Sequence, residues 1–188
     1  MHRAAILLAL AVAPVSAGAT LIGDTVTVRF GTDSGAGFSE LSSVDIVVAA
    51  GTSDATMVGG SGSFPHIFDA EASSFTLTQA STGWGEPFVF NGYVVDSLDW
   101  VGMPGGFIGD ISFTTNVAGL TDDRVTFTDH AVLIDFQGLS VNNGFITVEL
   151  TAIPEPSTAL LLGAGVLVLA AARCRALELP GFRGQLTA

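Results

Sequence analysis

Short apolar runs separated by turn-forming residues dominate the middle of this sequence, between residues 20 and 153. The runs are rich in Val, Ile, Thr and Phe, and the segments between them are rich in Gly, Ser, Asp and Asn. Residues 25–30 alternate, which places Val26, Val28 and Phe30 on one side of an extended chain. No window of a dozen residues has the period of a helix. This region is therefore predicted to fold into strands and turns.

Eight segments have the composition of strands: residues 25–30, 44–50, 74–79, 88–95, 109–115, 124–127, 131–136 and 145–152. Turn sequences such as Gly59-Gly60-Ser61-Gly62 and Asn142-Asn143-Gly144 lie between several of them. We therefore expect an all-β fold, one antiparallel β-sandwich over residues 20–152, with a jelly roll as the alternative sub-type. Seven phenylalanines are expected to fill the space between the sheets: Phe75, Phe88, Phe90, Phe113, Phe127, Phe136 and Phe145.

The charge balance restricts the partners of this domain. Acidic residues outnumber basic ones by 18 to 6, and of the six arginines only Arg29 and Arg124 lie in the middle region. An anionic surface repels phosphate backbones, and the sequence has no basic stripe that would release counterions from a nucleic acid. Nucleic-acid binding is therefore excluded as the function of this chain.

Histidine and cysteine are too sparse for a zinc site. The middle region contains His66 and His130 and no cysteine, whereas zinc needs several such ligands at defined spacings. His66 follows a proline and His130 lies in a Thr-Asp-His turn, so both are expected to be exposed to solvent. We expect no metal, no cofactor and no catalytic residue in this region.

Carboxylates are the remaining candidates for catalysis or for metal binding. They form two groups in the sequence, Asp96 with Asp99, and Asp122 and Asp123 with Asp129. Paired carboxylates can hydrolyse glycosides and clustered ones can bind calcium, but exposed acidic loops are far commoner than either. The sequence therefore favours a protein that is not an enzyme, with calcium binding as an alternative.

The two tryptophans are predicted to differ in their surroundings. Trp84 lies between two glycines in a loop sequence and is expected to be exposed, where its ring could stack on a sugar. Trp100 lies next to a strand pattern and is expected in the core. A glycan-binding module is therefore an alternative function.

The first 19 residues have the pattern of a secretory signal peptide. Arg3 precedes the apolar run 4–13, and small residues follow at Val15-Ser16-Ala17 and Ala17-Gly18-Ala19. The apolar run is too short for a permanent membrane span. We predict export by the Sec machinery and cleavage by signal peptidase after Ala19, with Ala17 as the alternative site.

The C-terminal region combines a proline-rich box, an apolar run and a basic cluster. Pro154-Glu155-Pro156 ends the strand pattern, because prolines cannot continue a ladder of hydrogen bonds. Residues 159–172 carry no charge, and Arg173 and Arg175 follow, which predicts a cytoplasmic end. The run is shorter than the roughly 20 residues that normally span a bilayer, so a short or tilted transmembrane helix is expected, with a buried core helix as the alternative.

This combination resembles the PEP-CTERM sorting signal of Gram-negative bacteria. The resemblance assigns residues 153–175 to the signal and makes Pro154, Glu155 and Pro156 a processing motif and not a catalytic site. It implies export, transient anchoring in the inner membrane, and recognition by an exosortase, a membrane transpeptidase that is thought to cleave near the motif. Residues 176–188 extend beyond the usual end of such signals and are expected to be a disordered tail.

The predicted function follows from these parts together. The chain is expected to be an exported, non-enzymatic protein of the cell surface or extracellular matrix, associated with biofilm, with exopolysaccharide as a candidate partner. The alternatives are a secreted glycan-binding or calcium-binding β-sandwich, or a glycoside-active enzyme.

Overall fold

The computed structural model describes residues 18–51, 53–58, 65–80, 82–85, 88–154, 164–165 and 167–168. The chain divides into two units at the bond between Ile153 and Pro154. The described part of the first unit consists of β-strands, their connections and one short 3-10 helix, η1 (Asp122–Arg124). In the second unit the four described residues of 164–165 and 167–168 are helical.

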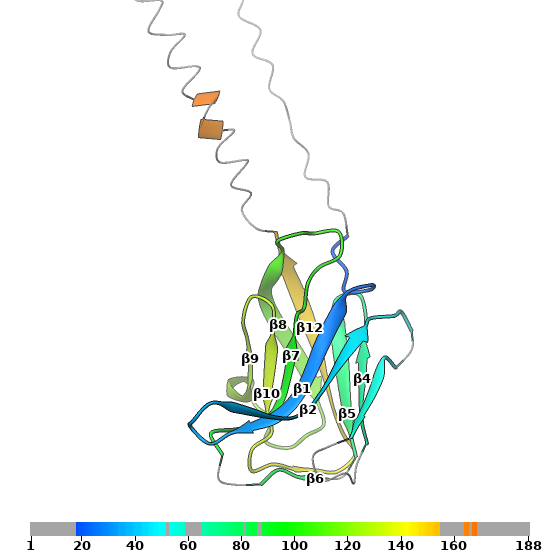
Figure 1. Ribbon diagram of the computed structural model, residues 1–188, viewed down its shortest axis with the longest axis vertical. Coiled ribbons are helices and arrows are strands. Elements are labelled where there is room, and N and C mark those ends of the chain that lie inside the picture. Colours follow the sequence, from blue (N-terminus) through cyan, green and yellow to red (C-terminus); the bar gives the residue numbers. More distant parts are fainter. Residues whose placement is uncertain are drawn as a thin grey trace, which may run out of the picture. The chain divides into compact units, whose positions relative to one another are not determined.

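Two five-stranded sheets make up the first unit, and Figure 1 shows β1 and β2 nearer the viewer than β8 and β12. In the first sheet the order β2-β1-β7-β10-β9 joins Phe38–Val47, Thr25–Asp33, Phe90–Asp96, Val132–Asp135 and Val125–Phe127. In the second sheet the order β3-β4-β5-β12-β8 joins Ala55–Val58, Pro65–Ala70, Ser74–Gln79, Gly144–Ile153 and Phe107–Thr115. A small pair joins β6 (Thr82–Gly83) to β11 (Ser140–Val141). Neighbouring strands are antiparallel throughout, which confirms the predicted all-β, sandwich-like fold.

Alternating side chains explain why these segments form strands with one buried face. In β1, Val26 and Val28 are fully buried, whereas Thr25 is exposed and Arg29 lies at the outer surface. In β12, Ile146 and Val148 are fully buried, and the residues between them face outward. Burial of apolar area at about 25 cal/mol per Å² is the main force that holds the two faces together.

The aromatic core differs in part from the predicted one. Phe75 and Phe136 are buried as predicted, but Phe127 and Phe145 are 39% and 38% exposed. These two predictions are wrong: the alternation of β12 turns Phe145 outward, between the inward-facing Gly144 and Ile146, and Phe127 is the exposed last residue of the edge strand β9. Three others, Phe88, Phe90 and Phe113, are only half-buried. The largest fully buried side chains are instead led by Tyr93 and Phe68.

Each of the eight predicted strands coincides at least partly with an observed strand. The predicted segment 44–50 is displaced, since β2 begins at Phe38 and ends at Val47. Strands β3, β4, β6 and β11 were not predicted. Strands β6 and β11 have two residues each, and β4 contains Pro65, His66 and Asp69, which mask its alternation. The jelly-roll alternative stays a prediction.

Trp84 and His66 are buried, so the prediction that both are exposed is wrong. They are 5% and 4% exposed, respectively. The Trp84 backbone donates to Leu139 O at 3.0 Å and accepts from Gly138 N at 2.9 Å, which ties its loop to the fold and directs the ring inward. The ring stacks on Phe136 at a centroid distance of 4.9 Å. Trp100 is 4% exposed, which confirms its predicted place in the core.

Several polar side-chain atoms lie in this interior without a hydrogen-bond partner in the described part of the chain. They include His66 Nδ1, Tyr93 Oη, Trp84 Nε1 and both amide atoms of Gln79. His66 and Gln79 are directly opposed on β4 and β5, and the His66 ring lies 5.6 Å from that of Tyr93. Burial lowers the pKa of His66 and raises the pKa of Tyr93, because both charged forms lose hydration.

We expect the free energy of unfolding to fall as the pH drops below the ordinary histidine pKa of 6.5. In the folded state burial lowers the pKa of His66, so the unfolded chain binds more protons in the window from 6.5 down to the folded pKa. Stability therefore rises with pH across that window. Urea denaturation at about pH 7.5 and about pH 5.5 measures the difference, which His66→Gln should reduce.

The matched control for this prediction is His130→Gln. His130 is exposed and lies in a loop, so its replacement leaves the buried His66 in place and should retain the fall in stability at the lower pH. An identical pH dependence in the parent chain and in His66→Gln would contradict the prediction.

Candidate functional site

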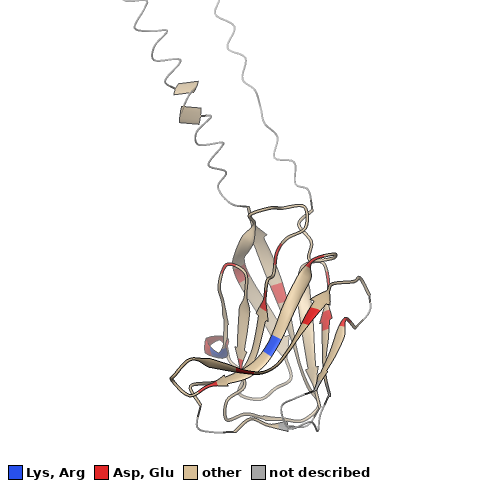
Figure 2. Cartoon of the chain, viewed as in Figure 1, with Lys and Arg blue, Asp and Glu red and all other residues tan. Residues whose placement is uncertain are grey.

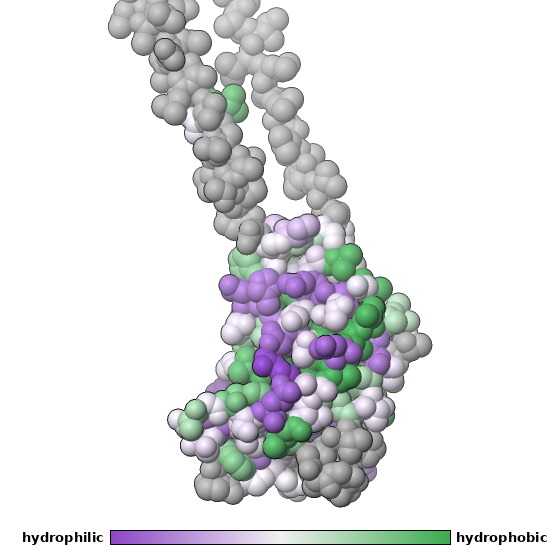
Figure 3. Space-filling view, in the orientation of Figure 1, coloured by the Kyte–Doolittle hydropathy of each residue, from purple (hydrophilic) through white to green (hydrophobic). Residues whose placement is uncertain are grey.

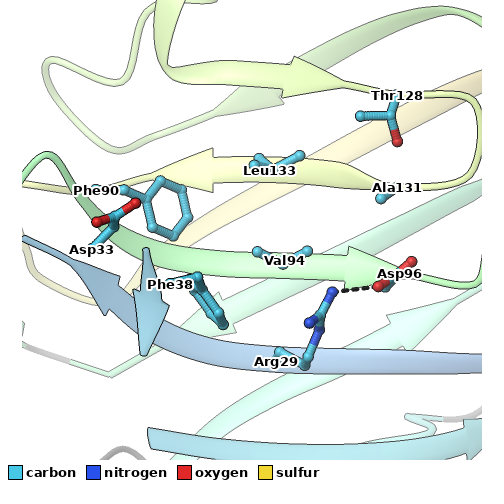
Figure 4. A pocket seen from close by; sticks show the side chains of 9 residues that line it. All are labelled: Arg29, Asp33, Phe38, Phe90, Val94, Asp96, Thr128, Ala131 and Leu133. Atoms are coloured by element: carbon cyan, nitrogen blue, oxygen red, sulfur yellow. Dashed lines mark hydrogen bonds and ion pairs between the residues drawn. The ribbon is translucent and has the colours of Figure 1, made fainter. Parts of the chain in front are cut away.

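A groove of about 450 Å³ opens on the outer face of the sheet that contains β1 (Figure 4). Its walls and floor come from β1, β2, β7 and β10 and from the loop between β9 and β10. On this side of the molecule, hydrophilic and hydrophobic patches lie next to each other (Figure 3). The groove therefore combines apolar and charged surface within one small area.

Strand register builds the groove from two rows of side chains. One row crosses three strands, because Val94 on β7 pairs with Arg29 on β1 and with Leu133 on β10. The other row crosses the far end of the sheet, where Asp33 on β1 lies between Phe38 on β2 and Phe90 on β7.

Two glycines lie between these rows. Gly31 and Gly92 are paired across β1 and β7, and close neighbours occupy the space next to each of them. A Cβ atom on Gly31 would lie 2.5 Å from Cζ of Phe38, so the Phe38 ring lies over this glycine. A Cβ atom on Gly92 would lie 1.9 Å from the Ile134 carbonyl oxygen, so the close packing of β7 and β10 also requires glycine there.

Arg29 is the basic residue of the groove. Its Nη2 donates to Asp96 Oδ2 in an ion pair, and the two side chains are 31% and 37% exposed. The guanidinium carbon lies 5.7 Å from the centre of the Phe38 ring. An exposed pair of this kind contributes at most about 1 kcal/mol to stability. Its main effect is to hold a donor and an acceptor side by side at the edge of an aromatic surface.

Asp33 fixes the turn that places Phe38. Its Oδ1 accepts from the backbone N–H groups of Gly35 at 2.6 Å and Gly37 at 3.1 Å. Both glycines have positive φ, the conformation such a turn needs. The loop therefore returns the chain so that Phe38 meets Phe90 with ring centroids 6.0 Å apart in an edge-to-face arrangement.

The predicted carboxylate groups are not brought together as ligands. Asp96 is paired with Arg29, while Asp99 Oδ1 lies 3.0 Å from His130 Nδ1. Asp123 accepts from the Thr121 hydroxyl at 2.5 Å, and this hydrogen bond lowers the pKa of Asp123. Among the described residues, no group of three or more His, Cys, Asp or Glu side chains could hold a metal ion.

The predicted processing sites lie at or beyond the limits of the described structure. Strand β12 ends at Ile153, and Pro154 is exposed directly after it. Glu155, Pro156, Arg173, Arg175 and Ala17 lie outside the described residues. Leu167 and Val168 belong to the predicted apolar helix and are exposed. Within the described positions, no helix has the length and apolar character needed to cross a membrane.

At the other end of the domain, the described structure starts close to the predicted signal-peptidase site. Ala19 packs against the core, Thr20 forms a bridge with Val101, and Leu21 is fully buried. The chain that follows the predicted cleavage point is thus part of the fold from its first residues.

Comparison with known proteins identifies the segment that follows the last strand. The family model described as PEP-CTERM protein-sorting motif matches residues 152–176. The chain carries a PEP-CTERM sorting motif. The match begins at Ala152, the second-last residue of β12, and extends past Arg173 and Arg175. A PEP-CTERM motif implies export, exosortase-dependent processing at the membrane and a destination at or beyond the cell surface.

The remaining comparisons yield no relatives. No curated protein matches the chain, and no solved structure matches it. The PEP-CTERM motif accounts for the C-terminal segment. The function of the domain ahead of it has to be inferred from the structure of that domain.

Proposed function

We propose that this chain is a non-enzymatic component of the cell surface or extracellular matrix, exported by Sec, cut by signal peptidase and sorted by an exosortase. In this proposal the inner membrane holds the precursor only until processing, and exopolysaccharide is the partner of the mature protein. The PEP-CTERM motif at residues 152–176 is the observation that carries the proposal.

The position of the motif relative to the fold supports a processing role. The last core residue of β12 is Leu150, and the final strand pair joins Ile153 to Phe107. Pro154 follows at once and is exposed. Cleavage near the Pro154-Glu155-Pro156 box would therefore separate the sorting segment without removing any residue of the hydrophobic core.

The charge of the domain is compatible with a protein that is soluble outside the cell. Between residues 20 and 153 there are 16 acidic and two basic side chains. Figure 2 shows the acidic positions spread over both sheets and the basic ones confined to two places. A high net charge of one sign keeps proteins soluble and apart from one another.

Expression in a Gram-negative host with and without an exosortase tests the proposal. With the enzyme, mass spectrometry of the envelope and medium fractions should find a chain that has lost Arg173, Arg175 and all later residues. Without it, the chain should stay in the inner-membrane fraction and extend to Ala188. The same full-length product in both hosts would contradict the proposal.

A further inference from the structure

We propose that the groove around Arg29 binds a neutral saccharide, with a sugar ring on Phe38 and Phe90 and its hydroxyl groups against Arg29 and Asp96. The inference deepens the proposed function, on which its biological setting rests, by assigning the partner a site. The binding itself can be measured independently of sorting.

The apolar part of the groove suits the C–H face of a sugar ring. Phe38 and Phe90 are both half-buried, so each ring presents surface to solvent while its other side packs on the protein. Their edge-to-face contact, with an interplanar angle of 60°, holds both rings in place. Val94 and Leu133 continue the apolar floor, as Figure 4 shows. Aromatic rings in a groove of this size are typical of small-ligand sites.

The polar edge of the groove suits hydroxyl groups. A hydroxyl both donates and accepts, and the Arg29–Asp96 pair offers a donor next to an acceptor. The ion pair neutralises both partners, so a ligand needs no charge of its own. Both side chains are about one third exposed and lie beside the aromatic floor, within reach of the same ligand.

Charge argues against an anionic ligand. Arg29 shares the groove with Asp33 and Asp96, and the domain carries 16 acidic side chains against two basic ones. A uronic acid or phosphate would meet net negative potential on approach. The preferred saccharide is therefore neutral.

Peptide partners fit less well. Arg29 compensates the charge of Asp96, so this carboxylate attracts a cationic side chain weakly while its remaining lone pairs still accept from a hydroxyl group. The groove lies on the face of the sheet, over β1 and β7, whose backbone groups are paired within the sheet. An added peptide strand needs an open edge.

Saturation-transfer NMR on the full chain, in a detergent without a sugar headgroup, tests the inference. The neutral probes are cellohexaose, laminarihexaose, maltohexaose and mannohexaose, and oligogalacturonate is the anionic probe. We expect at least one neutral probe to bind with a dissociation constant on the order of 1 mM, and oligogalacturonate to give no signal. Phe90→Ala and Phe38→Ala should each weaken binding by about three- to tenfold.

Phe145→Ala is the control, because Phe145 is a phenylalanine at the surface of the second sheet and does not line the groove. It should leave the affinity unchanged. No signal from any neutral probe, or equal affinities for the parent, Phe38→Ala and Phe90→Ala, would overturn the inference. A stronger signal from oligogalacturonate than from the neutral probes would also overturn it.

Chemical protection gives a measurement that needs no variant. Phenylglyoxal modifies arginine, and Arg29 and Arg124 are almost equally exposed, at 31% and 29%. A bound saccharide should slow the labelling of Arg29 and leave that of Arg124 unchanged; equal rates with and without saccharide would overturn the inference. Loss of binding with correct C-terminal processing would remove only this inference, whereas failed processing with intact binding would remove only the sorting proposal.

Discussion

Replacement of Trp84 by alanine is expected to lower the free energy of unfolding by about 3–5 kcal/mol. The ring is 5% exposed and packs against Phe136, Phe30 and Tyr93, with centroid distances of 4.9, 5.4 and 5.6 Å. Its removal leaves a cavity in contact with both sheets, because His66 of β4 lies 6.4 Å from the same ring. Urea denaturation followed by circular dichroism measures the loss.

The control for this prediction is again Phe145→Ala, which removes an aromatic ring that is 38% exposed. It should lower stability by clearly less, about 1 kcal/mol or below, as expected for a surface position. The account of the core would be contradicted if Trp84→Ala were no more destabilising than Phe145→Ala. That result would instead support the prediction from the sequence that Trp84 is exposed.

The strand pattern was predictable wherever alternation is undisturbed. Residues 74–79 were predicted with the bounds that β5 has, because Phe75 and Leu77 alternate with Ser and Thr. Strand β4 was missed because its inward-facing positions begin with His66, a residue type that counts as polar in any pattern. Aromatic and ring-stacking contacts with Phe30, Trp84 and Tyr93 bury it, and these contacts come from distant segments.

The direction of the Trp84 ring could not be read from its neighbours in the sequence. Flanking glycines identify a loop but do not say which side of the loop faces the core. The hydrogen bonds to Leu139 and Gly138 decide this, and they join segments more than 50 residues apart.

The groove could not be predicted from the sequence, although two glycines within strand sequences mark its position. Gly31 and Gly92 lie inside strand sequences, and glycine within a strand often marks close approach of another group. Which residues surround the hollow depends on register: Arg29 faces Val94, and Phe38 reaches Phe90 across β1. Register between strands more than 50 residues apart is a tertiary property.

The sorting motif, by contrast, was predictable from the sequence, because its parts are contiguous in the chain. Residues 153–175 were assigned from the box, the apolar run and the arginines, and the family model matches 152–176.

Replacement of the Pro154-Glu155-Pro156 box by three alanines is expected to abolish exosortase processing and to have little effect on the stability of the domain. The folded strands end at Ile153, and the core ends at Leu150. Without the box the apolar segment and the following arginines should remain attached and hold the precursor in the membrane. The matched control changes the same residue types outside the motif, as Glu178→Ala with Pro180→Ala.

The most direct measurement is the fraction of chain processed in cells that contain an exosortase, determined by fractionation and C-terminal mass spectrometry. The account predicts a shortened chain at the cell surface or in the medium for the parent and for the Glu178→Ala/Pro180→Ala control. It predicts an uncleaved, membrane-retained chain for the triple-alanine variant. Equal processing and release of all three chains would contradict it.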